Sequence, residues 1–329
     1  MAALIKQIEI GNFKSIRNAK IHSCKRINLF IGRPNVGKSN ILEALSLFSV
    51  PYLAFYKSKN LKDFVRGESA GELFYSGDFE SPAYVETNIA LASLMLDRVD
   101  GLDLKLFFED KSILEHFYFS DNLQLVNRRK RALINSPVKK YTFNTRFEDS
   151  DLSNYALLPP FGGNLYRAIE THEELRKEVE GIFKEYQLEL VFDRASRTLK
   201  VLKHNKDSVF LIPYNSIADT LQRIIFYKAA IASNDNSVLL FEEPEAHSFP
   251  PYITQVTQEM IYHKTNQYFV ATHSPFILND LMENARDELA VYLIDYKQQE
   301  TKVKRLSDQS MHEIYQSGVD LFTNWETFA

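Results

Sequence analysis

Apolar and polar residues along this chain follow two different periods, and each period predicts a different kind of element. Short, mostly apolar runs are typical of strands buried on both faces. Segments with apolar residues every three to four positions are typical of helices. The two kinds of segment alternate: apolar runs lie at residues 26–31, 238–241 and 267–271, and helical patterns at 40–48, 216–232 and 251–263. This alternation predicts an α/β fold with a doubly wound, mainly parallel sheet.

The early and middle parts of the chain favour a second, antiparallel sheet. Strand-like runs lie at 83–91, 104–109 and 117–126. Residues 1–17 predict an edge strand and a turn. We therefore expect an antiparallel β flank beside the parallel sheet.

The remaining segments predict a helical insert, a hairpin and a C-terminal strand and helix. One helix is predicted over 164–186, and a hairpin around the turn at 193–196. Charged residues and prolines are frequent over 128–160, which we interpret as loops and a connector. Near the end of the chain we expect a strand at 291–294, a turn region at 297–304 and an amphipathic segment at 309–322.

Composition narrows the class of protein. Of the 329 residues, 45% are apolar and 25% are charged, as in a globular protein with a sizeable core. No segment approaches the roughly 20 apolar residues that a membrane helix needs, and charges interrupt the N-terminus before any signal-like run. A single cysteine, Cys24, excludes an internal disulfide, and we interpret it as structural. We expect a cytoplasmic protein with no membrane partner.

The first chemical motif is a glycine loop between the strand at 26–31 and the helix at 40–48. It fits the pattern Gly-x-x-x-x-Gly-Lys-Ser, in which backbone N–H groups surround phosphates, Lys38 reaches the outer phosphates and Ser39 ligates Mg²⁺. The order strand, loop, helix is the one that this pattern requires. The predicted ATP-binding residues are Gly32, Arg33, Pro34, Asn35, Val36, Gly37, Lys38, Ser39 and Asn40.

Two further motifs follow apolar strands, where ligands sit in such sheets. Glu242 and Glu243 come directly after the strand at 238–241. We predict that Glu242 binds Mg²⁺ and that Glu243 orients and deprotonates the attacking water, as in a Walker B site with its catalytic acid. His273 follows the strand at 267–271 and is placed to contact the terminal phosphate. Taken alone, each motif also fits a plain loop, a helix start or a structural histidine.

These motifs in this order resemble the ABC-type ATPases of the RecF, SMC and OLD (overcoming lysogenization defect) group. The resemblance rests on 12–15 (Asn-Phe-Lys-Ser), the glycine loop, 242–247 (Glu-Glu-Pro-Glu-Ala-His) and 272–275 (Thr-His-Ser-Pro), and it extends from about residue 4 to 290. Within the group the chain looks most like the small stand-alone AAA-family ATPases found near bacterial anti-phage or DNA-processing genes.

The resemblance implies one ATPase domain over residues 1–329. Its P-loop NTPase core would come from 1–50 and 205–295, with an inserted β and helical lobe at about 51–204 and a C-terminal extension at about 288–329. In this family two nucleotides lie between two subunits, so the resemblance implies a homodimer or higher homo-oligomer on ATP.

The family's signature loop, which completes the partner's site, is best matched by Ser216, Ala218 and Asp219. The same residues fit a capping box at a helix start, with Ser216 and Asp219 at the right separation. Both interpretations stay open, because a capped helix N-terminus that faces a partner is itself an anion site.

Three departures from the family pattern bear on turnover. Ala218 replaces the usual second signature glycine, and Glu242 replaces the usual Walker B aspartate, so catalysis is expected to be slow and the magnesium geometry relaxed. Residues 40–123 contain no glutamine, so the glutamine-loop residue that links magnesium to the flanking lobe stays unassigned.

The leading hypothesis is an ATP-hydrolysing switch that dimerises on ATP and gates a partner or a nucleic acid in DNA processing or anti-phage defence. The tail after the last core strand has no room for the nuclease domain of OLD proteins, so we expect any nuclease or toxin effector to be a separate chain. One alternative is a nucleotide-locked scaffold with little turnover, which Ala218 favours. Another is direct DNA binding through the basic residues 128–131 and 139–140. A GTPase is disfavoured because the guanine-reading Asn-Lys-x-Asp is missing, and a transporter subunit because the motifs match the DNA-linked group.

Overall fold

The computed structural model describes residues 5–97, 101–108, 113–129, 136–145, 154–206, 208–318, 321, 322 and 324. At its centre lies a six-stranded sheet in the order β16-β15-β3-β14-β13-β9. The strands from β15 to β9 are parallel, and β16 pairs antiparallel with β15 at one edge. Their bounds are β3 (Ile27–Ile31), β9 (Val138–Tyr141), β13 (Val238–Glu242), β14 (Gln267–Ala271), β15 (Leu289–Lys297) and β16 (Glu300–Arg305). The predicted mainly parallel sheet is confirmed.

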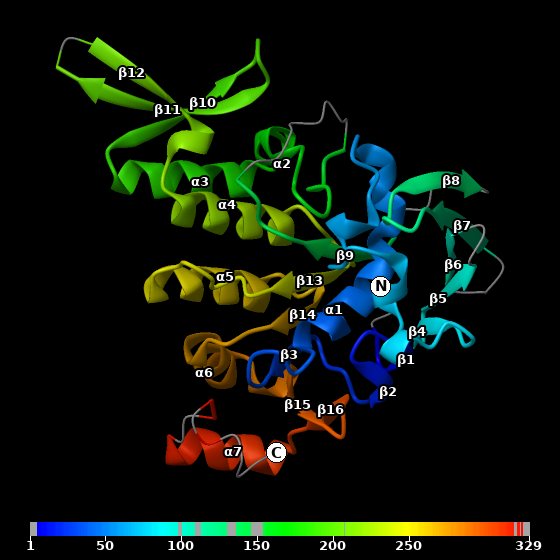
Figure 1. Ribbon diagram of the computed structural model, residues 1–329. Helices are drawn as coiled ribbons and strands as arrows, with labels where there is room; N and C mark the ends of the chain where they lie inside the picture. Colours follow the sequence, from blue (N-terminus) through cyan, green and yellow to red (C-terminus); the bar gives the residue numbers. More distant parts are fainter. Residues whose placement is uncertain are drawn as a thin grey trace.

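Helices cover both faces of this sheet (Figure 1). On one face, Leu239 and Phe241 of β13 share a buried cluster with the helices that come after residue 164 in the chain. On the other face Leu240 packs with the helix that follows the glycine loop. The helices are α1 (Lys38–Ser46), α2 (Leu165–Thr171), α3 (Glu173–Glu185), α4 (Asp219–Ala232), α5 (Pro250–Tyr262), α6 (Pro275–Asn284) and α7 (Asp308–Ser317). Short 3-10 turns span η1 (Leu47–Phe55), η2 (Leu61–Asp63), η3 (Ala70–Leu73), η4 (Tyr75–Gly77), η5 (Tyr214–Ser216) and η6 (Arg286–Glu288).

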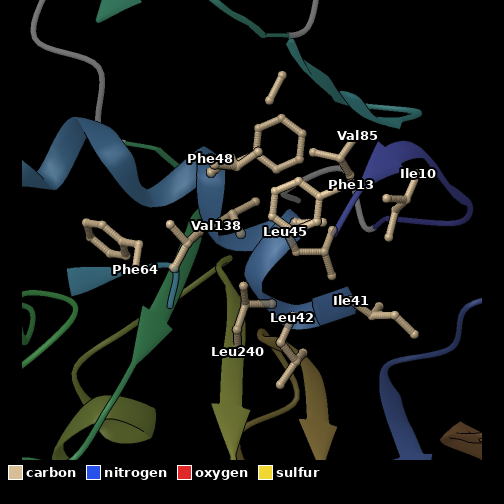
Figure 2. Close-up of a cluster of buried hydrophobic side chains, with 14 of the residues drawn as sticks. Ile10, Phe13, Ile41, Leu42, Leu45, Phe48, Phe64, Val85, Val138 and Leu240 are labelled. Carbon is tan, nitrogen blue, oxygen red and sulfur yellow. The ribbon is translucent and has the colours of Figure 1, made fainter. Parts of the chain in front are cut away.

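A second, antiparallel sheet of seven strands forms the predicted β flank, in the order β2-β1-β4-β5-β6-β7-β8. It comprises β1 (Ile8–Phe13), β2 (Ile16–Ile21), β4 (Ala83–Thr87), β5 (Ala90–Asp97), β6 (Gly101–Phe108), β7 (Ile113–Phe119) and β8 (Leu125–Arg129). Helix α1 lies between the two sheets. Figure 2 shows Leu45 of α1 beside Phe13 and Val85 of the flank, and Leu42 beside Leu240 of the parallel sheet. Packing on both sides explains why nearly all of α1 is buried.

The predicted hairpin is present and carries a third strand. It consists of β10 (Leu188–Asp193), β11 (Thr198–Asn205) and β12 (Ser208–Pro213), in that order. Figure 1 shows it projecting from the end of the molecule that carries α3 and α4. In the described part of the chain, no helix is both long and apolar enough to cross a membrane.

Several elements differ from the sequence-based expectation. The strand β1 lies inside the flank, between β2 and β4, and not at its edge, because it also pairs with a strand more than 70 residues away. The helix predicted over 164–186 is broken at His172, whose backbone is extended. Just before the break, the Thr171 hydroxyl donates to the Arg167 carbonyl (2.8 Å), a contact that competes with the helix ladder.

The segments expected as loops at 128–160 and as a turn at 297–304 both contain strands of the parallel sheet. They provide β9 and β16, so the sheet takes one strand from within the residues that we assigned to the inserted lobe. The division of the chain into core, lobe and extension stays a prediction.

Candidate functional site

The three motifs meet at one edge of the parallel sheet. The glycine loop follows β3, the acidic segment follows β13 and His273 follows β14. The strands β3, β14 and β13 are parallel neighbours, so their carboxyl ends lie side by side. The Glu243 N–H donates to the Ala271 carbonyl (2.8 Å) and the Thr272 N–H to the Phe30 carbonyl (3.2 Å), which joins the three strand ends.

Both glycines of the loop are required by the space around them. A Cβ at Gly32 would lie 2.2 Å from the Ile294 carbonyl oxygen, and one at Gly37 would lie 2.1 Å from Thr301 Oγ1. Gly37 also has a φ of 101°, which other residues rarely adopt. The backbone can therefore turn tightly from β3 into α1 only with glycine at these positions.

The N-terminus of α1 is suited to an anion. Its N-cap, Gly37, has no side chain to cap it, and its first turn contains no acidic residue, so the first N–H groups of the helix are suited to accept an anion. Lys38 Nζ donates to the carbonyls of Gly32 (2.9 Å) and Arg33 (2.8 Å), which holds its ammonium over the loop. Burial lowers the pKa of Lys38 to about 8, although the carboxylates of Glu243, Glu242 and Glu245 act in the opposite direction. The loop therefore fits a phosphate chain.

Residues outside the predicted motif hold the glycine loop in place through hydrogen bonds. Thr301 of β16 is fully buried, and its hydroxyl donates to the Val36 carbonyl (3.0 Å) and lies 2.7 Å from the Ser15 hydroxyl. Asn40 Nδ2 donates to the same Ser15 hydroxyl (2.6 Å). Sequence reasoning missed Thr301, because 297–304 was expected to be a turn. Asn40 was predicted to bind ATP, but its side-chain amide donates to Ser15 and so helps to hold the loop in place.

The predicted metal ligands Ser39 and Glu242 lie near one another, since the Ser39 hydroxyl is among the groups that lower the pKa of the Glu242 carboxyl. Glu242 also forms an ion pair with Arg66, and its carboxylate lies 4.0 Å from Lys140 Nζ. Burial alone would raise the pKa of Glu242, but Lys140, Ser39 and Arg66 outweigh it and hold that pKa below its ordinary value. A hydroxyl and an ionised carboxylate beside a phosphate loop are the oxygen ligands that Mg²⁺ prefers, so these residues fit the ion.

Glu243 and His273 face one another at the rim of the site. Glu243 Oε1 lies 3.5 Å from His273 Nε2, and about half of the Glu243 side chain is exposed. Glu243 has a positive φ of 43°, a conformation uncommon for a residue with a side chain. Burial, followed by the charge of Lys38, lowers the pKa of His273, so its imidazole is neutral at pH 7. A neutral histidine can donate one hydrogen bond and accept another.

A third acid, Glu245, belongs to the site although sequence analysis gave it no role. Its Oε1 accepts hydrogen bonds from the Thr272 hydroxyl (2.6 Å) and from the His273 N–H (2.9 Å). Burial raises the pKa of Glu245 above its ordinary value. Its position in the sequence, two residues after Glu243 in the same acidic motif, could have identified it as a member of the site.

The predicted signature residues Ser216, Ala218 and Asp219 are all exposed. The capping-box interpretation was wrong: α4 begins at Asp219 after Ala218, with no side-chain cap, while Ser216 ends the short turn η5. The Thr220 hydroxyl donates to the His247 carbonyl (3.1 Å), which links the start of α4 to the segment after the acidic motif. The role of these residues in a partner's site stays a prediction.

Three of the basic residues proposed as DNA contacts, Lys139, Lys140 and Arg128, are buried or paired with an acidic residue. Lys139 and Lys140 are buried in β9, with 6% and 5% of their surface exposed, because their ammonium groups bond to Asn234 Oδ1 and to the Phe64 carbonyl. Arg128 pairs with Glu115 (2.6 Å). The other members of the cluster, Lys130 and Arg131, lie outside the described residues, as does the Arg129 side chain.

Comparison with known proteins agrees with this arrangement. Residues 4–208 match the AAA ATPase domain family. An ATP/GTP phosphatase of Helicobacter pylori is 29% identical over 34% of this chain and 31% of its own length. The DNA replication and repair protein RecF of Caldanaerobacter subterraneus subsp. tengcongensis is 27% identical over 46% of this chain and 44% of its own length. The chain thus spans less than half the length of both relatives.

A solved SMC head, bound to the C-terminal winged-helix domain of ScpA, superposes with a TM-score of 0.53 at 14% identity. The match covers 95% of this chain and all of that one, and it shows a shared fold. The family match over residues 4–208 shows that the chain belongs to the AAA ATPase domain family, and the sequence motifs resemble those of the RecF and SMC group.

Proposed function

We propose that this protein is a Mg²⁺-dependent ATPase that dimerises around ATP and uses hydrolysis to switch a partner effector. The observation that carries the proposal is the meeting of five side chains at the edge formed by β3, β14 and β13. They are Lys38, Ser39, Glu242, Glu243 and His273. Such a set combines a phosphate cradle, metal ligands, a base and a neutral histidine in one place.

Each side chain has a role in the proposed reaction. The loop N–H groups and Lys38 hold the phosphates, and Ser39 with Glu242 would hold Mg²⁺, which neutralises charge on the outer phosphates. Glu243 accepts the proton of the attacking water as the bond between the terminal phosphorus and the bridging oxygen breaks. His273, held by Glu245 through its backbone, hydrogen-bonds the terminal phosphate.

Dimerisation would bring the start of α4 of one copy onto the nucleotide of the other. The supporting observation is that Ser216 and Ala218 are exposed and the N-terminus of α4 carries no side-chain cap, so its N–H groups are accessible to a partner.

We also propose that the switch acts on a separate chain, a nuclease or a toxin, in DNA processing or anti-phage defence. The supporting comparison is the SMC head, which was solved with a domain of ScpA bound to it. RecF is named for DNA replication and repair. Direct DNA binding by Lys139 and Lys140 receives no support, because both are buried.

The experiment is mass by light scattering with phosphate release in parallel, on the wild type and Glu243→Gln, in ATP and Mg²⁺. We expect turnover in the wild type and a dimer, at twice the monomer mass, that accumulates in the variant. Glutamine keeps the shape of Glu243 but cannot take the proton, so the ATP-bound state is trapped. A wild type that releases no phosphate and stays monomeric in ATP would contradict the proposal.

The same experiment decides a second candidate, a scaffold locked by nucleotide. The observation in its favour is Ala218 at the exposed start of α4, where a methyl group would stand beside a partner's phosphates. A stable wild-type dimer that forms with ATP and releases no phosphate would establish the scaffold instead.

A further inference from the structure

The three-stranded sheet β10-β11-β12 ends in an edge strand whose side chains are uncovered. Among the described strands, β12 pairs with β11 alone. Its residues Val209, Phe210 and Leu211 are 60%, 63% and 48% exposed. Successive side chains of a strand point to opposite faces, so neither face of β12 is packed at these positions. Figure 1 shows the sheet projecting from the body of the molecule, which leaves this edge accessible to another chain.

The edge of β12 lacks the features that usually prevent pairing with another chain. Edge strands are commonly protected by charged residues, by proline or by a bulge. Residues 208–212 contain no charge, their register with β11 is regular, and Pro213 stands only at the end of the strand. An apolar edge of this kind presents a row of backbone N–H and C=O groups, to which an extended segment can add as a further strand.

The charge around β12 indicates which kind of segment fits it. Residues 188–213 contain five lysines and arginines and three acidic residues, a net charge of +2, whereas the whole chain carries −4. Both described acids of the sheet are already paired with basic residues of β11. Lys203, which lies opposite Phe210, and Lys206 are exposed and form no ion pair with a described residue. The positive charge favours a partner segment that carries acidic residues.

Two other occupants fit this edge less well. A second copy of the chain would bring another positively charged sheet to the first, so like charges would meet. The phosphates of a nucleic acid would be attracted by the lysines, but they make no use of the exposed apolar side chains. A protein strand matches both properties, because its backbone pairs with β12, its apolar residues cover Val209 and Leu211, and its acids meet the lysines.

The edge strand is also joined to the surface that we propose for dimerisation. β12 ends at Pro213, and the predicted signature residues begin three positions later, at Ser216. Between them, the hydroxyl of the buried Tyr214 donates to the Gln222 carbonyl of α4 (3.5 Å). Gln222 Nε2 donates in turn to the Ile217 carbonyl (2.9 Å). A short, hydrogen-bonded segment therefore connects β12 to the start of α4.

We propose that β12 is the docking site of the effector chain, which adds an extended apolar segment with flanking acidic residues as a fourth strand of this sheet. The inference rests on the proposed function, because it assigns the surface at which the separate effector binds. Docking at β12 places the effector beside the start of α4, whose surroundings would change when the ATP dimer closes.

The test is the binding of three labelled peptides to the full chain without nucleotide, measured by fluorescence anisotropy. The first peptide alternates valine and threonine over six residues, the length of β12, and has glutamates at both ends. The second has lysines in place of the glutamates, and the third is the first with its central backbone nitrogens methylated. We expect the first to bind at least about tenfold more tightly than the others, because the second is repelled by the sheet and the third cannot donate strand hydrogen bonds.

Phe210→Glu tests whether the first peptide binds at β12. Phe210 is exposed, so we expect a thermal melt like that of the wild type, and the added charge should weaken binding of the acidic peptide at least about tenfold. Val126→Glu is the matched control, because Val126 is 69% exposed on β8, an edge strand of the seven-stranded sheet. This control should leave the affinity unchanged.

Several results would overturn the inference. Failure of the first peptide to bind, or equal binding of all three, would show that β12 does not accept an acidic strand. An unchanged affinity in Phe210→Glu, or an equal loss in Val126→Glu, would place the binding elsewhere. A dimer that forms without nucleotide and is lost in Phe210→Glu would assign the edge to a second copy, and a DNA duplex that displaces the peptide would assign it to nucleic acid.

The proposed function is tested separately from the docking site, because the peptides are added without nucleotide. A wild type that binds the first peptide at β12 but neither hydrolyses ATP nor dimerises on it would contradict the proposed function and leave the docking site in place. A wild type that turns over ATP but does not bind the peptide would overturn the docking site alone.

Discussion

Glu245 holds His273 in place through the backbone: its buried carboxylate accepts the His273 N–H at 2.9 Å and the Thr272 hydroxyl at 2.6 Å. The two residues end neighbouring strands, since Glu245 follows β13 and His273 follows β14. The contact therefore fixes the spacing between the proposed base Glu243 and the proposed phosphate contact His273.

Glu245→Ala should destabilise the fold, because it leaves two buried donors without an acceptor. An unsatisfied donor costs about 1–3 kcal/mol, and the loss should appear as a lower free energy of unfolding in denaturant titration. Glu245→Gln is the matched control, since its amide oxygen can still accept both bonds, which a single oxygen, Oε1, accepts in the wild type. Equal stability of the alanine variant and the wild type would show that the two donors find other acceptors.

The raised pKa of Glu245 predicts how the wild type and Glu245→Gln diverge with pH. The folded state holds this proton more tightly than the unfolded state, so the contribution of Glu245 to stability falls as pH rises above the ordinary glutamate pKa of about 4.3. The difference in unfolding free energy, wild type minus Glu245→Gln, should therefore decrease from pH 4 to pH 7. A difference that increases over this range would mean that the carboxylate is stabilised in its charged form.

Lys38→Ala should abolish ATP binding without unfolding the chain, because Lys38 is the cation that the phosphate loop contributes. The measurement is a nucleotide titration together with a thermal melt. In the wild type, the lowered pKa adds a pH dependence: binding should weaken about tenfold for each pH unit above about 8, as Lys38 loses its charge. Normal affinity in Lys38→Ala would contradict the assignment of the loop.

The parallel sheet could be predicted from the sequence because four of the five residues in each central strand, β3, β13 and β14, are apolar. The edge strand β9 could not, since half of its residues are lysines. Their ammonium groups are buried only because Asn234 and the Phe64 carbonyl, both far away in the chain, accept their hydrogen bonds. The pattern of polar and apolar residues along the chain does not reveal hydrogen-bond partners that are so far away in the sequence.

The same limit applies to the candidate site. Residues next to one another in the chain, such as Lys38 and Ser39 or Glu242 and Glu243, stand out as motifs. Thr301 and Arg66 do not, because each reaches the site through the fold, from β16 and from the loop between η2 and η3. The start of α4 also escaped prediction, since Ser216 and Asp219 have the spacing of a capping box although Ala218 precedes the helix.

Ser216→Arg should spare ATP binding by the monomer and prevent the ATP dimer. Ser216 is exposed just before α4, on the surface that we propose to meet a partner's nucleotide, and an arginine there adds bulk where backbone and phosphate would approach. The variant is made in the Glu243→Gln background, in which the dimer accumulates, and its mass is measured by light scattering with ATP. Ser317→Arg is the matched control, because Ser317 is an exposed serine on α7, at the opposite end of the molecule from α4 (Figure 1). If Ser216→Arg still dimerises, the dimer contact lies elsewhere. If both variants stay monomeric, the added charge alone blocks assembly, and the result does not place Ser216 at the dimer contact.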